Sequence, residues 1–86
     1  MEITAKHLKS ARILLDWSQK DLAKHSGVSV PTIQRMESTS EGRVRGNYES
    51  VSKVQKALEN AGIDFVDEPR GHGVLLKPHK GEHPNF

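Results

Sequence analysis

Residues 19–38 read QKDLAKHSGVSVPTIQRMES, and the fold prediction starts from this stretch. Gly27 lies in its middle, where glycine can adopt the left-handed backbone conformation that ends a helix and turns the chain. Ser18 and Ser29 are predicted N-caps of the two flanking segments, and Pro31 falls in a first turn, where a missing N–H costs nothing. We therefore predict two short helices joined by a three-residue turn, which is the arrangement of a helix-turn-helix.

The apolar residues of this stretch are predicted to face a common core, because they recur at helical spacing: Leu22, Val28, Ile33 and Met36. Acidic Asp21 lies three residues after Ser18, at a position that favours a helix start. Trp17 is placed to pack onto Leu22 as a hydrophobic staple. We therefore expect Trp17 to be a core residue rather than a platform for stacked bases.

Two further helices flank this pair. Thr4 is the predicted N-cap of the first, whose apolar stripe is Leu8, Ala11, Leu14 and Leu15, with Ile13 as a further candidate. Asn47 is the predicted N-cap of the last helix, and Gly62 is predicted to end it. The apolar residues of this helix are Val51, Val54, Ala57, Leu58 and Ala61.

After Gly62 the pattern changes to two short apolar runs, 63–66 and 74–77, which predict a β-hairpin. His72 falls in the turn-rich segment between them and is interpreted as a turn residue. We expect an all-α fold of four to five helices with a short C-terminal hairpin. It divides into a helix-turn-helix domain (1–62), a hairpin that can serve as a dimerisation element (63–77) and a flexible tail (78–86).

Length and composition limit the possible functions. A chain of 86 residues buries a modest core, so a second copy can supply missing burial. Residues 1–46 carry eight Lys and Arg against five Asp and Glu, whereas residues 47–86 carry five against six, so the first half is the better nucleic-acid candidate. The sequence has no cysteine, no membrane-length apolar run and no secretory apolar stretch near its start, so we expect a cytoplasmic protein.

Motifs for catalysis or metal binding are not found in the sequence. His79 and His83 are four residues apart, but Pro78, Gly81 and Pro84 prevent a helix that would place both rings on one face. No phosphate-binding loop, nucleophile elbow or pair of catalytic carboxylates is recognisable. We therefore expect no enzyme, no metal site and no cofactor.

The segment from Gln19 to Ser38, with Ala23 where the helices cross and Gly27 in the turn, resembles the lambda-repressor-like (Cro/cI-type) helix-turn-helix family. With the flanking helices the resemblance covers roughly residues 4–62. It implies a bacterial or phage regulator whose second helix of the pair enters the major groove of double-stranded DNA. The base-reading positions that it implies are Val30, Pro31, Thr32, Gln34 and Arg35.

The resemblance also implies contacts to DNA phosphates and one structural ion pair. The phosphate positions are Ser18, Gln19, Ser29, Thr39, Arg43 and Arg45, although Ser18 could serve only as a cap and the arginines only as loop residues. Arg12 and Glu37 correspond to a partly buried ion pair between the first helix and the end of the recognition helix. Arg35 and Gln34 suit guanine and adenine respectively, while Val30 and Pro31 depart from the family's usual polar residues.

These features lead us to expect a homodimeric transcriptional repressor that reads an inverted-repeat operator and associates with the nucleoid through DNA. Steric repression is the simplest mechanism, since no separate effector domain is recognised. Two alternatives stay open, each with a protein partner: an antitoxin that covers a toxin with its C-terminal segment, or a protein-interaction module that has lost DNA binding. The apolar dipeptide Val30-Pro31 is the feature that favours the last.

Overall fold

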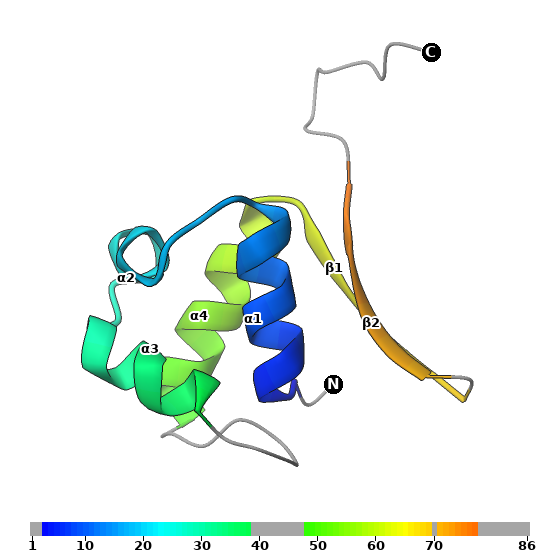
Figure 1. Cartoon of the computed structure of the whole chain (residues 1–86), viewed down its shortest axis with the longest axis horizontal. Helices are drawn as coiled ribbons and strands as arrows, with labels where there is room; N and C mark the ends of the chain where they lie inside the picture. Colours follow the sequence, from blue (N-terminus) through cyan, green and yellow to red (C-terminus); the bar gives the residue numbers. More distant parts are fainter. Residues whose placement is uncertain (1–2, 39–47, 70, 78–86) are drawn as a thin grey trace, which may run out of the picture.

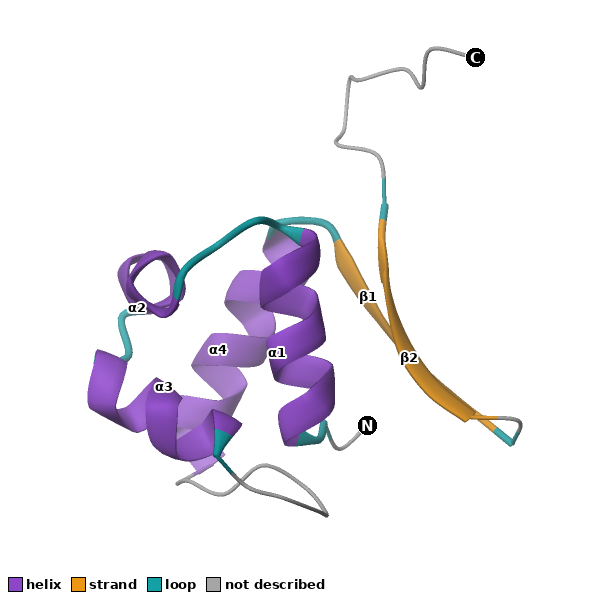
Figure 2. Cartoon of the chain, in the orientation of Figure 1, coloured by secondary structure: helices purple, strands orange, loops and turns teal. Residues whose placement is uncertain are grey.

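The structure is a computed structural model, and it describes residues 3–38, 48–69 and 71–77 of the chain. The elements in chain order are α1 (Ala5–Leu14), α2 (Gln19–Ser26), α3 (Val30–Glu37), α4 (Tyr48–Asn60), β1 (Ile63–Glu68) and β2 (Gly71–Leu76). In Figures 1 and 2, α1 and α4 form the centre, with α2 and α3 on one side and the hairpin on the other. The predicted helical fold with a C-terminal hairpin is confirmed, with four helices in the described part of the chain.

Each of the first three helices begins at a predicted cap. Thr4 accepts a hydrogen bond from the His7 backbone N–H, and Ser18 and Ser29 accept from Asp21 and Thr32 in the same way. Such caps satisfy backbone donors that have no partner inside the helix. The helix starts are therefore fixed by residues three positions apart in the sequence. Asn47, the predicted cap of α4, lies outside the described residues.

The turns after α1 and α2 both use left-handed backbone. Gly27 ends α2 with φ of 75°, as predicted, and its N–H donates to the Ala23 carbonyl. Asp16 has φ of 58° after α1, and the Trp17 N–H donates to the Arg12 carbonyl at 2.9 Å. This is the hydrogen-bond pattern of a Schellman motif with aspartate in place of the usual glycine. Left-handed backbone at Asp16 was not predicted, since glycine is the usual residue at this position.

One hydrophobic core joins all four helices and the first strand. Its fully buried large residues are Leu8, Leu22, Ile33, Met36, Val54, Leu58 and Ile63. The predicted core roles of Leu8 and Ala11 are confirmed, but those of Ile13 and Leu14 are wrong, because they are 63% and 45% exposed. At 3.6 residues per turn, Leu14 and Ile13 project roughly 120° and 140° away from Leu8 on opposite sides of the helix.

The hairpin is longer than predicted. β1 and β2 pair antiparallel in a register that places Phe65 opposite Val74 and Asp67 opposite His72. The prediction of His72 as a turn residue is therefore wrong, since its backbone belongs to β2. Phe65 and Val74 share one face of the hairpin and pack against the core. The predicted tail, 78–86, lies outside the described residues.

Candidate nucleic-acid interface

The recognition helix α3 presents one exposed stripe. Pro31, Gln34, Arg35 and Ser38 lie three and four positions apart and are all exposed, while Ile33, Met36 and Glu37 on the opposite side are buried. The side chains of Gln34 and Arg35 make no hydrogen bond or ion pair with any other residue that the structure describes. Three of the five predicted base-reading residues, Pro31, Gln34 and Arg35, are therefore together and accessible.

The other two predicted base-reading residues are less accessible. Val30 is the first residue of α3 and is half-buried. Thr32 is also half-buried, and its hydroxyl lies 2.9 Å from the Ser29 hydroxyl that caps the helix. Ser29 and Thr32 thus already have a structural partner in each other. Base reading by Thr32 and phosphate contact by Ser29 stay predictions.

A buried ion pair fixes α3 relative to α1. Arg12 Nε donates to Glu37 Oε2 at 2.8 Å, and Arg12 Nη2 donates to Glu37 Oε1 at 3.0 Å, so the pairing is bidentate. The side chain of Glu37 is only 3% exposed and that of Arg12 is 16% exposed. Bidentate pairs of this kind set geometry as well as charge. The residues implied by the resemblance as an ion pair are thus in contact.

The same network reaches the start of α2. Arg12 Nη1 donates to the Trp17 carbonyl at 2.8 Å, and Gln19 Nε2 donates to Glu37 Oε1 at 3.2 Å. Gln19, a predicted phosphate contact, therefore also ties the first residue of α2 to the last residue of α3. This bond was not predicted, because Gln19 and Glu37 are 18 positions apart and no local signal links them.

The N-terminus of α2 has a complete capping box. The Ser18 hydroxyl accepts from the Asp21 N–H at 3.0 Å, and the Ser18 N–H donates to Asp21 Oδ2 at 2.9 Å. Hydrogen bonding from Ser18, first of all from its backbone N–H, lowers the pKa of Asp21, because it stabilises the charged carboxylate. The Ser18 oxygen thus has the predicted capping role, and its phosphate contact stays a prediction. Thr39, Arg43 and Arg45 lie outside the described residues.

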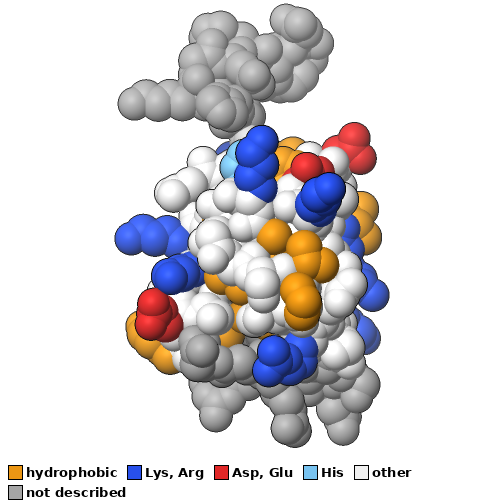
Figure 3. All heavy atoms as spheres, turned by 90° about the vertical axis from the view of Figure 1, so that its left-hand side faces the viewer, with side chains coloured by type: hydrophobic (Ala, Val, Ile, Leu, Met, Phe, Trp, Pro, Cys, Tyr) orange, Lys and Arg blue, Asp and Glu red, His pale blue; other side chains and the backbone are white. Residues whose placement is uncertain are grey.

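The face formed by α2 and α3 is mainly basic. Figure 3 shows Lys and Arg side chains spread around this side of the molecule, with hydrophobic side chains between them. Within the two helices, Lys20, Lys24 and Arg35 are exposed, whereas Asp21 is the one exposed acidic residue. Such an excess of positive charge attracts the phosphate backbone without selecting a sequence.

Beside α2, the ring of Trp17 stacks on His25 with a centroid distance of 4.2 Å and an interplanar angle of 3°. Trp17 also packs against the core, in line with its predicted role as a core residue. The stack with His25 was not predicted. The stack joins the residue before α2 to a residue in its last turn. Trp17 and His25 are eight positions apart, which is farther than any helix-capping pattern reaches.

Comparison with known families agrees with this geometry. Residues 8–40 match the family model described as helix-turn-helix, which belongs to a DNA-binding regulatory family that is not typically enzymatic. A search of curated proteins finds no significant match. None of the described helices is long and apolar enough to cross a membrane. Residues 8–40 are therefore similar to the Cro/cI-like helix-turn-helix family, and α2 and α3 have the arrangement of a helix-turn-helix.

Proposed function

We propose that this helix-turn-helix regulator is a sequence-specific repressor that reads an inverted-repeat operator as a homodimer. The observation that carries the proposal is the exposed stripe of Pro31, Gln34 and Arg35 on α3. Arg35 can donate two hydrogen bonds to guanine and Gln34 can pair with adenine in the major groove. Pro31 offers an apolar surface for a thymine methyl group.

The contacts that anchor α3 at both ends favour sequence-specific base contacts over binding to the DNA phosphates alone. The bidentate pair of Arg12 and Glu37 holds the end of α3, while the Ser29 cap and Pro31 define its start. A reading helix must hold its side chains in a fixed register, because a displaced donor loses its base contact. The proposed role of α3 thus matches the way in which it is anchored.

The alternative of an interaction module without DNA binding rests on Val30 and Pro31. Their position gives them a structural reason, since Val30 is half-buried at the first residue of α3 and Pro31 lies in its first turn. An apolar pair here therefore shapes the helix start and leaves Gln34 and Arg35 available for bases. Bound in the major groove, the domain would block a promoter sterically, so repression requires binding alone.

Selection from a random duplex library, followed by sequencing, tests the proposal. We expect enrichment of an inverted repeat whose half-sites are about 34–36 Å apart, or a multiple of that spacing. Arg35→Ala should lose about 1–3 kcal/mol of discrimination at one base in each half-site. Lys77→Ala is the matched control, because Lys77 is also exposed and basic but directly follows β2. Figure 1 shows the hairpin on the side of the molecule away from α3.

Two results would contradict the proposal. Binding that is weak, strongly salt-dependent and without enrichment would leave counterion release as the whole source of affinity. Equal loss of affinity for all sequences with Arg35→Ala would show a phosphate contact rather than a base contact. A reporter gene placed behind the selected operator then tests the sign of regulation, and increased expression would rule out repression.

A further inference from the structure

The strand β2 has a free edge whose backbone groups can be assigned from the register. In the part of the chain that the structure describes, β2 pairs with β1 and with no other strand. The Lys77 N–H donates to the Gly62 carbonyl at 2.8 Å, so these two residues form a hydrogen-bonded pair just beyond the hairpin. Hydrogen-bonded and non-hydrogen-bonded pairs alternate along antiparallel strands. The residues of β2 whose backbone N–H and C=O groups point away from β1 are therefore His72, Val74 and Leu76.

This free edge lacks the features that normally prevent pairing with another chain. Natural edge strands often carry charged residues or proline, or are covered by a helix or loop. Residues 71–76 contain no Lys, Arg, Asp, Glu or Pro. The backbone groups of Val74 and Leu76 that point away from β1 make no hydrogen bond with another described residue. They are therefore available to an added strand.

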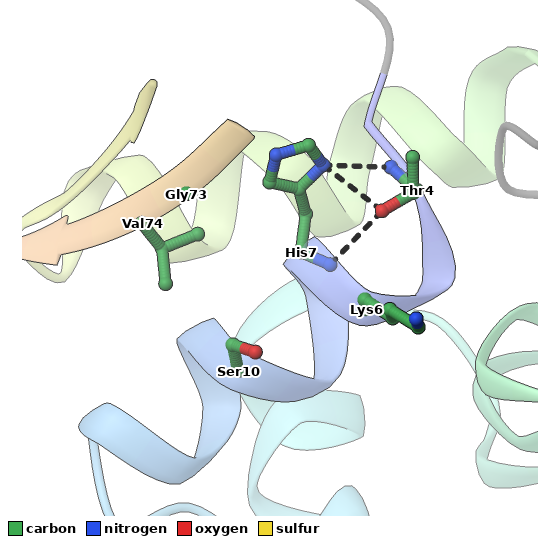
Figure 4. A pocket seen from close by; sticks show the side chains of 6 residues that line it. All are labelled: Thr4, Lys6, His7, Ser10, Gly73 and Val74. Atoms are coloured by element: carbon green, nitrogen blue, oxygen red, sulfur yellow. Dashed lines mark hydrogen bonds between the residues drawn. The ribbon is translucent and has the colours of Figure 1, made fainter. Parts of the chain in front are cut away.

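A hollow beside the free edge leaves room for such a strand. Figure 4 shows Lys6, His7 and Ser10 of α1 on one side of the hollow and Gly73 and Val74 of β2 on the other. His7 is buried, whereas Lys6 and Ser10 are exposed. Neighbouring strands lie about 4.7–4.9 Å apart, so a third strand next to β2 would have its helix-facing side chains at this hollow.

The charges around the hollow favour an acidic partner. α1 and β2 contain no Asp or Glu, whereas Lys6 and Lys9 on α1 and Lys77 after β2 are exposed. By contrast β1, whose sequence is IDFVDE, contains three acidic residues. Opposite charges on neighbouring strands are favourable and like charges are unfavourable. An acidic strand is therefore attracted to the free edge of β2 and repelled from that of β1.

We propose that the free edge of β2 is a docking site for an extended acidic segment of another protein, which pairs with β2 as a third strand. Backbone hydrogen bonds to His72, Val74 and Leu76 provide affinity in this mode of recognition, and the side chains of the added strand provide specificity. Carboxylates of the segment face Lys6 across the hollow. The inference goes beyond DNA binding, and Figure 1 shows the hairpin on the side of the molecule away from α3.

A second copy of this chain fits the same edge less well. Two β2 edges paired about a two-fold axis would bring the same surroundings of both copies together. Those surroundings are basic, because they include Lys6 and Lys77. Like charges repel each other there, so the charge pattern argues for a different and acidic chain.

Binding of a synthetic peptide to the full chain tests the proposal. The probe is a fluorescent eight-residue peptide of alternating valine and glutamate, blocked at both ends, and its anisotropy is followed without DNA. We expect saturable binding, and binding at least about fivefold weaker when lysine replaces glutamate. Hydrogen exchange of the Val74 and Leu76 amides should slow when the peptide is added. The amides of Gly73 and Leu75, which point at β1, should change little.

Proline variants test the backbone pairing. Leu76→Pro removes an N–H that points away from β1 and keeps the hydrogen bonds between the strands, so the hairpin should tolerate it. We expect this variant to bind the peptide roughly tenfold more weakly. Leu76→Ala keeps the N–H and should bind more tightly than Leu76→Pro. Asp67→Pro is the matched control, because it removes an outward N–H from the edge of β1 and should leave binding unchanged.

Two lysine variants test the charge preference. Lys6→Glu should weaken binding of the acidic peptide about threefold to fivefold, because Lys6 lines the hollow. Lys9→Glu changes the net charge by the same amount on the same helix but outside the lining residues, so it should have a smaller effect. Circular dichroism checks that each variant is folded.

Three results would overturn the proposal. The first is absence of saturable binding by the acidic peptide. The second is binding that Leu76→Pro and Asp67→Pro weaken equally, or that neither weakens. The third is slow exchange of the Val74 and Leu76 amides in the chain alone, which would show that a second copy or another part of the chain already pairs with this edge. Because the assay contains no DNA, any of these results leaves the test of operator selection unaffected.

Discussion

The ion pair of Arg12 and Glu37 offers the sharpest test of how α3 is held. In Arg12→Ala the Glu37 carboxylate loses both bonds from the guanidinium and keeps the bond from Gln19 at 3.2 Å. The Glu37 side chain is 3% exposed in the intact pair, so the carboxylate loses charged donors at a site with little access to water. Removing one partner of a buried pair costs about 3–5 kcal/mol.

That cost is large for a chain of this size. Domains have roughly 0.05–0.15 kcal/mol of stability per residue, which gives about 4–13 kcal/mol for this chain. A loss of 3 kcal/mol would lower the melting temperature by at least about 12 °C. Arg12→Ala should therefore unfold at much lower urea concentration, followed by circular dichroism and by the fluorescence of Trp17, the one tryptophan in the sequence.

Because Glu37 is more deeply buried than Arg12, we expect the variants of this pair to differ in how much they destabilise the fold. Glu37→Gln leaves Arg12, which is 16% exposed and still donates to the Trp17 carbonyl, so it should cost less than Arg12→Ala. The double variant Arg12→Met with Glu37→Leu removes both charges and should be nearer to wild type than Arg12→Ala. An Arg12→Ala variant within about 1 kcal/mol of wild type, or a larger cost for Glu37→Gln, would refute this reasoning.

Three further predictions concern helix ends. Hydrogen bonds from Ser18 lower the pKa of Asp21 from its ordinary value of 3.8. The charged Asp21 carboxylate therefore stabilises the fold above pH 3.8, and this stabilisation is lost as the pH falls through the lower pKa of the folded state. The difference in melting temperature between wild type and Asp21→Asn should therefore close in acid, and a difference that persists there would contradict this. Thr4→Ala should cost about 1 kcal/mol in urea unfolding because α1 loses its cap, with Thr4→Ser as the conservative control. Gly27→Ala should destabilise the fold by about 1–2 kcal/mol because the φ of Gly27, 75°, is left-handed. Asp16→Gly should be neutral or stabilising, because Asp16 is also left-handed. If both variants changed the free energy of unfolding in the same direction, backbone strain would not be the cause.

Local chemistry made the helix-turn-helix predictable. Ser18, Ser29 and Gly27 act on residues within four positions of themselves, so their roles depend little on the rest of the chain. The same holds for Thr4, although its partner His7 was not foreseen, because glutamate or glutamine is the usual third residue of a capping box. The exposed stripe of α3 likewise follows from helical spacing once the buried side is known.

The candidate site was only partly predictable. The position of Gln34 and Arg35 on the outer side of α3 follows from the sequence. That neither side chain has a hydrogen bond or ion pair with another described residue does not. Spacing alone could not reveal that Gln19 bonds to Glu37, which is 18 positions away. Such side chains have several possible partners, and the folded arrangement selects one.

The sequence by itself therefore determined where α1, α2 and α3 begin and where α2 ends, because caps and glycine turns are short-range hydrogen-bonding choices. Only the tertiary structure decided which apolar residues are buried. Ile13 and Leu14 are apolar like core residues, yet both project away from the side of α1 that carries Leu8, and both are exposed. The extent of the hairpin was decided in the same way, since β1 and β2 continue pairing through His72 once Phe65 and Val74 pack on the core. Burial depends on where distant segments lie, and local pattern therefore predicts it only in part.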